Sequence, residues 1–88
     1  MVKWRIKYHK KAHIDAKKII EAGLKDKLEL LLTIVESNPF QNPPPYEKLI
    51  GDLEGFYSRR INIQHRLIYE VDSEQRVVKV FKMWTHYE

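Results

Sequence analysis

The side chains best suited to chemistry gather in the second half of the sequence. Residues 55–69 read GFYSRRINIQHRLIY and hold three arginines and one histidine without a single acidic residue. Arginines interleaved with aromatic residues on adjacent strands suit contacts with phosphates and stacked bases. Carboxylates elsewhere in the chain would serve equally well as partners. This pattern therefore supports a nucleic-acid interface and a structural role for the arginines equally.

The end of the chain adds a histidine among aromatic residues, in the order Trp84, Thr85, His86, Tyr87 and Glu88. A histidine there is a candidate general acid with stacking surfaces beside it. A last strand with a packed tryptophan and a solvent-facing histidine explains the same residues. The pattern alone favours that second interpretation.

Several other chemistries are excluded or disfavoured by composition. The sequence has no cysteine, which excludes disulfides and thiolate catalysis. Its three glycines are scattered and form no phosphate-binding loop. His9 and His13 have the spacing of one helical turn, but no carboxylate triad accompanies them. We therefore expect neither a metal nor another cofactor.

Hydrophobic spacing indicates the elements that must position these groups. Residues 2–8 alternate between apolar and basic side chains, which predicts a half-buried strand. Residues 12–22 predict a lysine-rich helix that stops at Gly23. Residues 24–35 predict a second helix, whose broad apolar face suits packing on a sheet. The prolines of residues 38–45 then predict a stiff, extended connector.

Three segments rich in β-branched and aromatic residues follow, at 56–61, 65–71 and 77–84, and predict an antiparallel meander. The order strand, helix, helix and three strands predicts an α+β fold with both helices on one face of the sheet. A chain of 88 residues suffices for one small core. We therefore expect residues 1–88 to form a single domain of modest stability.

Positive charge is concentrated at the N-terminal end. The chain carries a net charge of +4. Residues 1–27 hold nine basic and three acidic residues, a net charge of +6, and the remaining residues carry a net charge of −2. Such a segment attracts polyphosphates or an acidic protein, although a solvated, lysine-studded helix explains it as well. No stretch is apolar enough to span a membrane, and the first residues lack the pattern of a cleaved leader. We expect a cytoplasmic protein without a membrane partner.

Together these segments closely resemble the YoeB/Txe family of bacterial toxins, which belongs to the RelE/ParE superfamily. The segments that carry the resemblance are NPF at 38–40, YEKL at 46–49, LEGFYSRRI at 53–61, HRLIY at 65–69 and the late His86-Tyr87 pair. Length and element order agree over nearly the whole chain. The resemblance implies a RelE/YoeB-like fold similar to that of small microbial ribonucleases.

The resemblance also implies an activity. Members of this family are ribosome-associated endoribonucleases that cut mRNA in the A site of the small ribosomal subunit, and a cognate antitoxin holds them inactive. By position, Glu47 matches the general base, Arg66 the phosphate-binding arginine and His86 the general acid. Further positions expected to contact RNA or phosphate are Arg59, Arg60, Tyr87 and Lys48.

These residue types suffice for RNA cleavage without a metal. The reaction needs a base for the 2′-hydroxyl proton, an acid for the departing 5′-oxygen and positive charge for the transition state. At pH 7 a carboxylate is mostly ionised and a histidine partly protonated, so the base and acid roles divide naturally. The structural alternatives are a solvated turn residue for Glu47 and a salt bridge of Arg66 with Glu70 on the sheet surface.

Strand alternation restricts this arrangement. It places only one of Arg59 and Arg60 on each face of the sheet, and the sequence does not choose between them. If the last two strands pair directly, Arg66 and His86 share a face only with an odd-length connection or a bulge in the pairing. The catalytic hypothesis therefore predicts one of those two features.

The chain departs from the family's pattern at three points. Ile50 replaces a lysine that some members carry three residues after the base, and Lys48 would substitute for it only with its side chain turned inward. Glu88 adds a carboxylate near the expected phosphate, and a triplet of prolines at 43–45 stands where relatives often have basic or glycine-containing sequence. Phosphate binding and ribosome contact are the properties these departures would affect.

The leading hypothesis is a ribosome-dependent mRNA endonuclease toxin with a YefM-like antitoxin. In this hypothesis four lysines dock on ribosomal RNA, namely Lys10, Lys11, Lys17 and Lys18. The alternative is a ParE-like toxin that poisons DNA gyrase by protein binding and needs no acid–base pair. An inactive RNA-binding relative is the third hypothesis, and a homodimer, which some relatives form, is consistent with the aromatic content.

Overall fold

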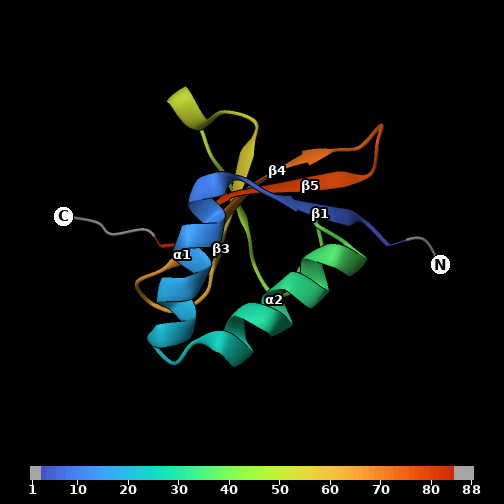
Figure 1. Cartoon of the computed structure of the whole chain (residues 1–88). Coiled ribbons are helices and arrows are strands. Elements are labelled where there is room, and N and C mark those ends of the chain that lie inside the picture. The colour runs from blue at the N-terminus through green and yellow to red at the C-terminus, as the bar shows by residue number, and fades with distance from the viewer. Residues whose placement is uncertain (1–2, 85–88) are drawn as a thin grey trace.

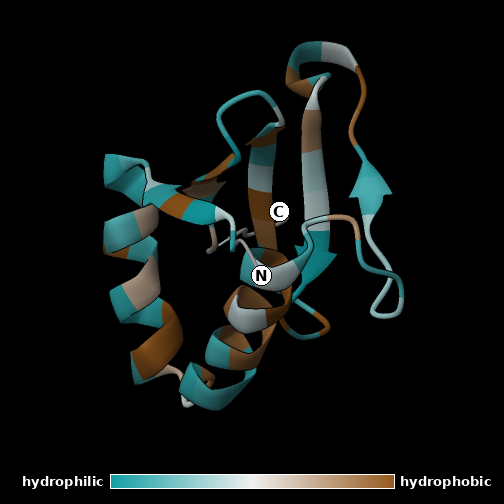
Figure 2. Cartoon of the chain, turned by 90° about the vertical axis from the view of Figure 1, so that its right-hand side faces the viewer, coloured by the Kyte–Doolittle hydropathy of each residue, from teal (hydrophilic) through white to brown (hydrophobic). Residues whose placement is uncertain are grey.

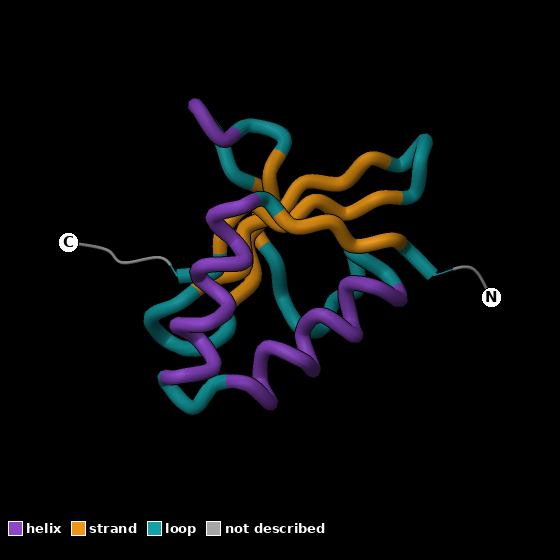
Figure 3. Tube along the Cα trace, viewed as in Figure 1, coloured by secondary structure: helices purple, strands orange, loops and turns teal. Residues whose placement is uncertain are grey.

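The computed structural model describes residues 3–84, which form one sheet with two helices packed against it (Figure 1). The elements, in chain order, are β1 (Arg5–Tyr8), α1 (Lys10–Glu21), α2 (Lys25–Ser37), β2 (Glu47–Lys48), the short 3₁₀ helix η1 (Gly51–Leu53), β3 (Phe56–Arg60), β4 (Arg66–Asp72) and β5 (Val77–Lys82). Figure 3 shows the long irregular connector that leads from α2 back to the sheet.

The sheet has five strands in the order β1-β5-β4-β3-β2. Strands β3, β4 and β5 form the predicted antiparallel meander, and β1 runs parallel to β5. The α+β class is therefore confirmed. The sequence does not predict β2, because two residues after a proline run carry no recognisable alternation. This short strand pairs antiparallel with β3 and adds a fifth strand at the edge.

The two helices begin and end close to the predicted positions. Helix α1 begins two residues earlier than the apolar spacing indicates, because His9 caps it. The Nδ1 atom of His9 accepts a hydrogen bond from the backbone N–H of Lys11 at 3.2 Å. The chain leaves α1 through Gly23, whose φ of 80° lies in the left-handed region that favours glycine.

Both helices bury a common core against one face of the sheet, as predicted (Figure 2). The buried core residues include Ala12 and Ile19 of α1, Leu28, Leu31 and Val35 of α2, and Leu67, Tyr69, Val78 and Val80 of the sheet. Because strand side chains alternate, residues between these positions on β3, β4 and β5 belong to the opposite face. That face carries no helix among the described residues and stays open.

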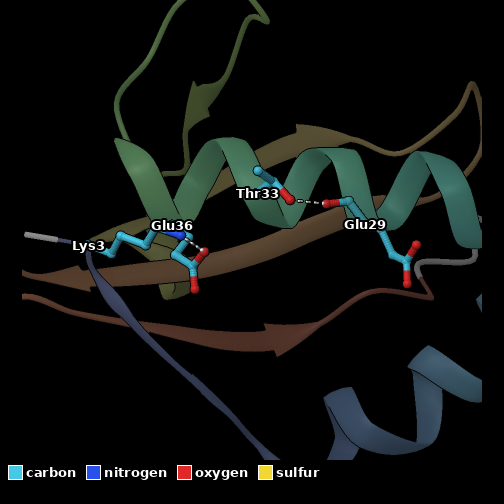
Figure 4. A network of polar contacts seen from close by, with 4 residues as sticks. All are labelled: Lys3, Glu29, Thr33 and Glu36. Carbon is cyan, nitrogen blue, oxygen red and sulfur yellow. Dashed lines mark hydrogen bonds and ion pairs between the residues drawn. The ribbon is translucent and has the colours of Figure 1, made fainter. Parts of the chain in front are cut away.

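The N-terminal strand is fastened to the last turns of α2. The backbone N–H of Trp4 donates to the carbonyl of Glu36 at 2.9 Å, and the Lys3 amine lies 3.7 Å from the Glu36 carboxylate (Figure 4). Within α2, the Thr33 hydroxyl donates to the carbonyl of Glu29 at 2.9 Å (Figure 4). The contacts with Glu36 hold β1 beside α2 while it pairs with β5.

A buried carboxylate joins α1 to the end of β5. Asp15 is 2% exposed, and its Oδ2 atom accepts hydrogen bonds from the backbone N–H groups of Met83 at 3.1 Å and Trp84 at 3.2 Å. Two amide donors compensate part of the cost of burying a carboxylate. The chain is thereby fixed against α1 at the point where it leaves the sheet.

A buried arginine holds the connector against the sheet. Arg59 of β3 is 1% exposed, and its Nε donates to the Tyr69 hydroxyl at 2.9 Å. Its terminal nitrogens donate to the backbone carbonyls of Pro44 at 2.7 Å, Pro39 at 3.0 Å and Gln41 at 2.8 Å. The connector is irregular rather than uniformly extended, because three of its carbonyls converge on one guanidinium.

The hydroxyl of Tyr69 completes this network. It donates to the carbonyl of Pro39 at 2.9 Å while it accepts from Arg59. Burial raises the pKa of Tyr69 above its ordinary value of 10.0, and the hydrogen bond and charge of Arg59 oppose that rise. The phenol is therefore protonated at neutral pH and keeps its donor.

The pairing of β4 with β5 contains the predicted irregularity. The connection between the strands spans residues 73–76 and is even in length, since Asp72 pairs with Val77. A bulge interrupts the register further on, where Ile68 pairs with Lys82 while Tyr69 pairs with Val80. The prediction of an odd connection or a bulge is therefore confirmed by the bulge, which reverses the alternation at the end of β5.

We expect Arg59→Lys to destabilise the fold far more than Arg60→Lys. Lysine keeps the charge of Arg59 but cannot reproduce a planar fork with five donors, so buried carbonyls are left without partners. The free energy of unfolding should fall by about 2–4 kcal/mol for Arg59→Lys and by less than about 0.5 kcal/mol at exposed Arg60. Urea unfolding followed by tryptophan fluorescence measures both, and equal stability of the two variants would contradict the anchoring role.

Candidate functional site

The open face of the sheet collects the polar side chains of three strands. Glu47 pairs with Ser58, and Arg60 pairs with Arg66, in the register of β2, β3 and β4. Directly opposed residues of an antiparallel pair point to the same face, and so do residues two apart on one strand. Glu47, Ser58, Arg60 and Arg66 therefore share the open face, although the chain separates the first from the last by a complete hairpin.

An ion pair links the edge strand β2 to β4 across this face. The Nη1 atom of Arg66 lies 3.6 Å from the Oε1 atom of Glu47, with the arginine side chain 21% exposed and the carboxylate side chain 64% exposed. The carboxylate reaches solvent, so it is accessible to a ligand. The guanidinium is partly covered and keeps a more restricted orientation.

This pair combines a proton acceptor with an anion-binding group. A carboxylate takes a proton from a hydroxyl held beside it, and a guanidinium binds a phosphate through two parallel hydrogen bonds. With the two groups within 4 Å of each other, one phosphodiester with its neighbouring hydroxyl can reach both. The arrangement therefore has the chemistry of a phosphodiester-cleaving half-site.

The structure decides between the two adjacent arginines. Arg60 is exposed and stands opposite Arg66 on the open face. Arg59 is buried on the helix side, with hydrogen bonds from Nε and both terminal nitrogens and with its guanidinium 5.0 Å from the Tyr46 ring centre. The expectation that Arg59 contacts RNA is therefore wrong, because its donors are already engaged inside the protein.

Lys48 requires a second correction. It pairs with Tyr57, so alternation directs it to the face opposite Glu47. It is exposed at the sheet edge and does not join the Glu47–Arg66 pair as the expected replacement for the lysine that Ile50 replaces. Ile50 itself is 85% exposed. His86 and Tyr87 lie outside the described residues, so their predicted roles stay predictions.

The sequence pattern does not predict two positioning residues, Arg59 and Asp15, or the burial of a third residue, Ser58. Arg59 looks identical to Arg60 in the sequence, and only the register separates them. Asp15 falls on the same helical stripe as Ala12 and Ile19, so helix spacing could have indicated its inward direction. Ser58 stands opposite Glu47 and has a buried hydroxyl without a hydrogen-bond partner among the described residues.

The last described residue is held beside the start of β4. The rings of His65 and Trp84 stack with centroids 3.9 Å apart and planes inclined by 24°, and His65 is 3% exposed. His65 immediately precedes Arg66 in the chain. The stacking therefore brings the C-terminal end of the described chain next to the strand that carries the arginine of the ion pair.

The four lysines expected to dock on RNA lie exposed on α1, namely Lys10, Lys11, Lys17 and Lys18. Positions seven residues apart on a helix share nearly the same direction, so these lysines form two adjacent rows. The Lys18 amine lies 6.0 Å from the Trp84 ring centre. The lysine rows thus border the C-terminal end of the described chain.

No group of three or more histidine and acidic side chains within residues 3–84 could hold a metal ion. None of the helices formed by these residues has the length and apolar run needed to span a bilayer.

Comparisons with known proteins agree with this architecture. Toxin YoeB of Streptomyces coelicolor is 36% identical over 52 residues, which cover 59% of this chain and 62%, less than two thirds, of that protein. The solved YoeB/ParE toxin of Agrobacterium tumefaciens superposes with a TM-score of 0.83 at 26% identity, over 94% of this chain and 99% of that chain.

A further solved relative is YoeB of Staphylococcus aureus in complex with YefM, with a TM-score of 0.80 at 32% identity, over 96% of this chain and 98% of that one. The same relative has also been solved as a dimer. A family model described as the YoeB-like toxin of bacterial type II toxin–antitoxin systems matches residues 8–87. The chain therefore belongs to the YoeB family of toxins from type II toxin–antitoxin systems.

Proposed function

We propose that this toxin is a ribosome-dependent endoribonuclease that cuts mRNA and so inhibits translation. Glu47 is the general base, Arg66 stabilises the phosphate and His86 is the general acid. The observation that carries the proposal is the 3.6 Å contact between Glu47 and Arg66 on the open face of the sheet. These two residues lie on different strands, β2 and β4, and supply two of the three groups the reaction requires.

The proposed reaction proceeds without a metal. Glu47 accepts the proton of a ribose 2′-hydroxyl, whose oxygen attacks the adjacent phosphorus. The bond from phosphorus to the 5′-oxygen then breaks, and His86 gives that oxygen a proton. Arg66, with Arg60 beside it, binds the negative charge that builds up on the phosphate oxygens. The products are a 2′,3′-cyclic phosphate and a 5′-hydroxyl.

Dependence on the ribosome follows from the exposure of the site. Positioned acid–base groups contribute about 10²–10⁴-fold to a rate. Further acceleration requires an oriented substrate. Glu47 lies on an uncovered face and is 64% exposed in its side chain, so this protein does little to enclose or orient RNA by itself. A ribosome that fixes the mRNA would supply that orientation.

The partners in this proposal are a YefM-like antitoxin, ribosomal RNA and mRNA. The Staphylococcus aureus relative was solved in complex with YefM and as a dimer, which supports an antitoxin and a homodimer for this chain also. An acidic, partly disordered antitoxin segment would suit the arginines of the open face. We place the toxin, as a single domain over residues 1–88, in the cytoplasm where ribosomes are found.

Glu47→Gln should slow cutting of ribosome-bound mRNA by about 10²–10⁴-fold, because glutamine cannot accept the 2′-hydroxyl proton. His86→Ala should slow it because the acid is then missing. The measurement is the appearance of 5′-hydroxyl ends in a purified translation reaction. Glu54→Gln makes the same chemical change at an exposed position outside the ion pair and serves as the control.

Stability separates a catalytic defect from unfolding. An exposed ion pair contributes at most about 1 kcal/mol, so Glu47→Gln should unfold almost like the wild type. Undiminished cutting by a folded Glu47→Gln variant would sink the nuclease hypothesis. If that variant kept its toxicity and the cells showed gyrase-dependent DNA damage, the ParE-like alternative would take its place.

The lysine rows of α1 should govern ribosome binding. Replacing Lys17 and Lys18 with glutamine should weaken binding and lower the slope of log affinity against log salt concentration by about 0.7–0.9 for each phosphate that a lysine no longer neutralises. The matched control changes Lys25 and Lys27, two exposed lysines on α2. Equal effects of the two pairs would show that net charge, and not docking by α1, sets the affinity.

A further inference from the structure

A second feature of the open face is a groove of about 350 Å³ between the catalytic pair and the edge strand β1. Its walls are largely aromatic, from Phe56 of β3, Phe81 of β5 and His9 at the start of α1. Three further side chains give it charge, namely Lys7, Lys79 and Glu70. None of these six residues is part of the catalytic hypothesis.

The bulge between β4 and β5 supplies one wall of this groove. Lys82 pairs with Ile68 and Val80 pairs with Tyr69, so Phe81 is the extra residue without a partner in the ladder. Its ring lies 5.5 Å from that of Phe56, inclined by 57°, and 5.3 Å from that of His9, inclined by 62°. Phe56 and Phe81 are only partly buried, so aromatic surface stays accessible from the open face.

Charge on the rim of the groove matches a polyanion. Lys7 and Lys79 pair directly in the β1–β5 register, so both amines rise from one face, and both residues are exposed. Glu70 pairs with Phe56 on one side and with Lys79 on the other. Two cations on the rim with one acceptor inside suit a ligand that is anionic along its length and carries N–H donors on a flat ring.

The groove continues from the catalytic pair along the same face. Ser58 stands opposite Glu47, and Phe56 lies two residues before Ser58 on β3, a distance of about 7 Å at the usual strand rise. Arg66 pairs with Arg60, four residues or about 13 Å from Phe56, so a phosphate bound at Arg66 would leave a neighbouring nucleotide of the same RNA strand within reach of Phe56 and Phe81. This continuity selects a nucleotide as the occupant.

We propose that this groove is the subsite for a nucleobase next to the scissile phosphate. The base stacks on Phe81 and Phe56, Lys7 and Lys79 contact the phosphate backbone, and Glu70 accepts a hydrogen bond from the edge of the base. Adenine, cytosine and guanine each offer an exocyclic amino group to the carboxylate, whereas uracil offers only its ring N3–H. The subsite therefore favours a base with an amino group over uracil. The proposal rests on the nuclease function and adds to it a determinant of sequence preference.

The test measures stacking directly and without catalysis. The Glu47→Gln protein is titrated at low salt into a short single-stranded RNA that contains 2-aminopurine, whose fluorescence falls when it stacks on an aromatic ring. Phe81→Leu, which keeps apolar volume without a π face, should weaken binding by about 5- to 100-fold and abolish the quenching. Phe81→Tyr, which keeps the ring, should restore both.

The remaining outcomes are equally decisive. Quenching that is absent with Glu47→Gln, or equal in Phe81→Leu and Phe81→Tyr, would overturn the subsite. The groove could instead be an interface between two copies of the chain. In that case Phe81→Leu would dissociate a dimer in sedimentation and leave RNA binding unchanged, and this result would also overturn the subsite. Thermal unfolding of each variant verifies the fold.

The cutting assay keeps this proposal separate from the nuclease proposal. If Glu47→Gln abolishes cutting and Phe81→Leu leaves both binding and cutting intact, the nuclease stands and the subsite fails. If cutting does not depend on Glu47 but quenching depends on the Phe81 ring, the base-binding groove stands and the nuclease assignment fails. In the wild-type background, Glu70→Gln should reduce the discrimination against uracil at the affected position.

Discussion

The position of the candidate base depends on one buried guanidinium. Arg59 donates to three carbonyls of the connector and to the Tyr69 hydroxyl. The desolvation of a buried charge is offset only when its donors are satisfied, so the connector cannot move away without leaving that charge unpaired. Strand β2 begins at Glu47, three residues after Pro44, whose carbonyl is the last of the three along the chain. The chain therefore enters the sheet from a point that Arg59 fixes. This contact adds to the pairing of the two-residue strand β2 and to the packing of Tyr46 on Tyr57, which together hold the carboxylate beside Arg66.

Alternation along β3 places a structural residue and a candidate RNA-binding residue on opposite faces of the sheet. Arg59 faces the helices and serves the fold, whereas Arg60, its neighbour, faces outward beside Arg66. A similar division occurs at the C-terminal end, where Asp15 binds the amides of Met83 and Trp84 while His65 stacks on the Trp84 ring. The connector before Glu47 and the chain after β5 are therefore both held by buried polar contacts on the helix side of the sheet. The open face needs no such contacts and stays accessible.

Much of the fold could be predicted from spacing alone, because strong periodicity reflects burial. The apolar stripe of residues 24–35 predicted α2, and the three β-rich segments predicted the meander. The strand β2 could not be predicted, since its pairing comes from the Arg59 network and not from its own two residues. The bulge was expected only as one of two options, because a register shift depends on how Phe81 packs and not on the residue types around it.

The site shows the same limit more sharply. Position relative to a known motif identified Glu47 and Arg66, and the structure brings them within ion-pair distance. The resemblance placed Arg59 among the RNA contacts, and Lys48 was expected to substitute for the lysine that Ile50 replaces. The face of the sheet on which each residue lies decides what it contacts instead. Face is set by register, and register is a property of the whole sheet. The aromatic groove could not be predicted from the sequence for the same reason, since its walls come from three separate elements.

The protonation of the anchor also bears on how activity should vary with pH. Because burial raises the pKa of Tyr69 above its ordinary value of 10.0, the folded state prefers the neutral phenol. The stability this contributes is fully present below pH 10 and is lost as the pH rises through the higher pKa of the folded state. The Arg59–Tyr69 network is therefore insensitive to pH across the physiological range, so under the proposed nuclease function a change in cutting rate between pH 5 and 9 would not originate in it.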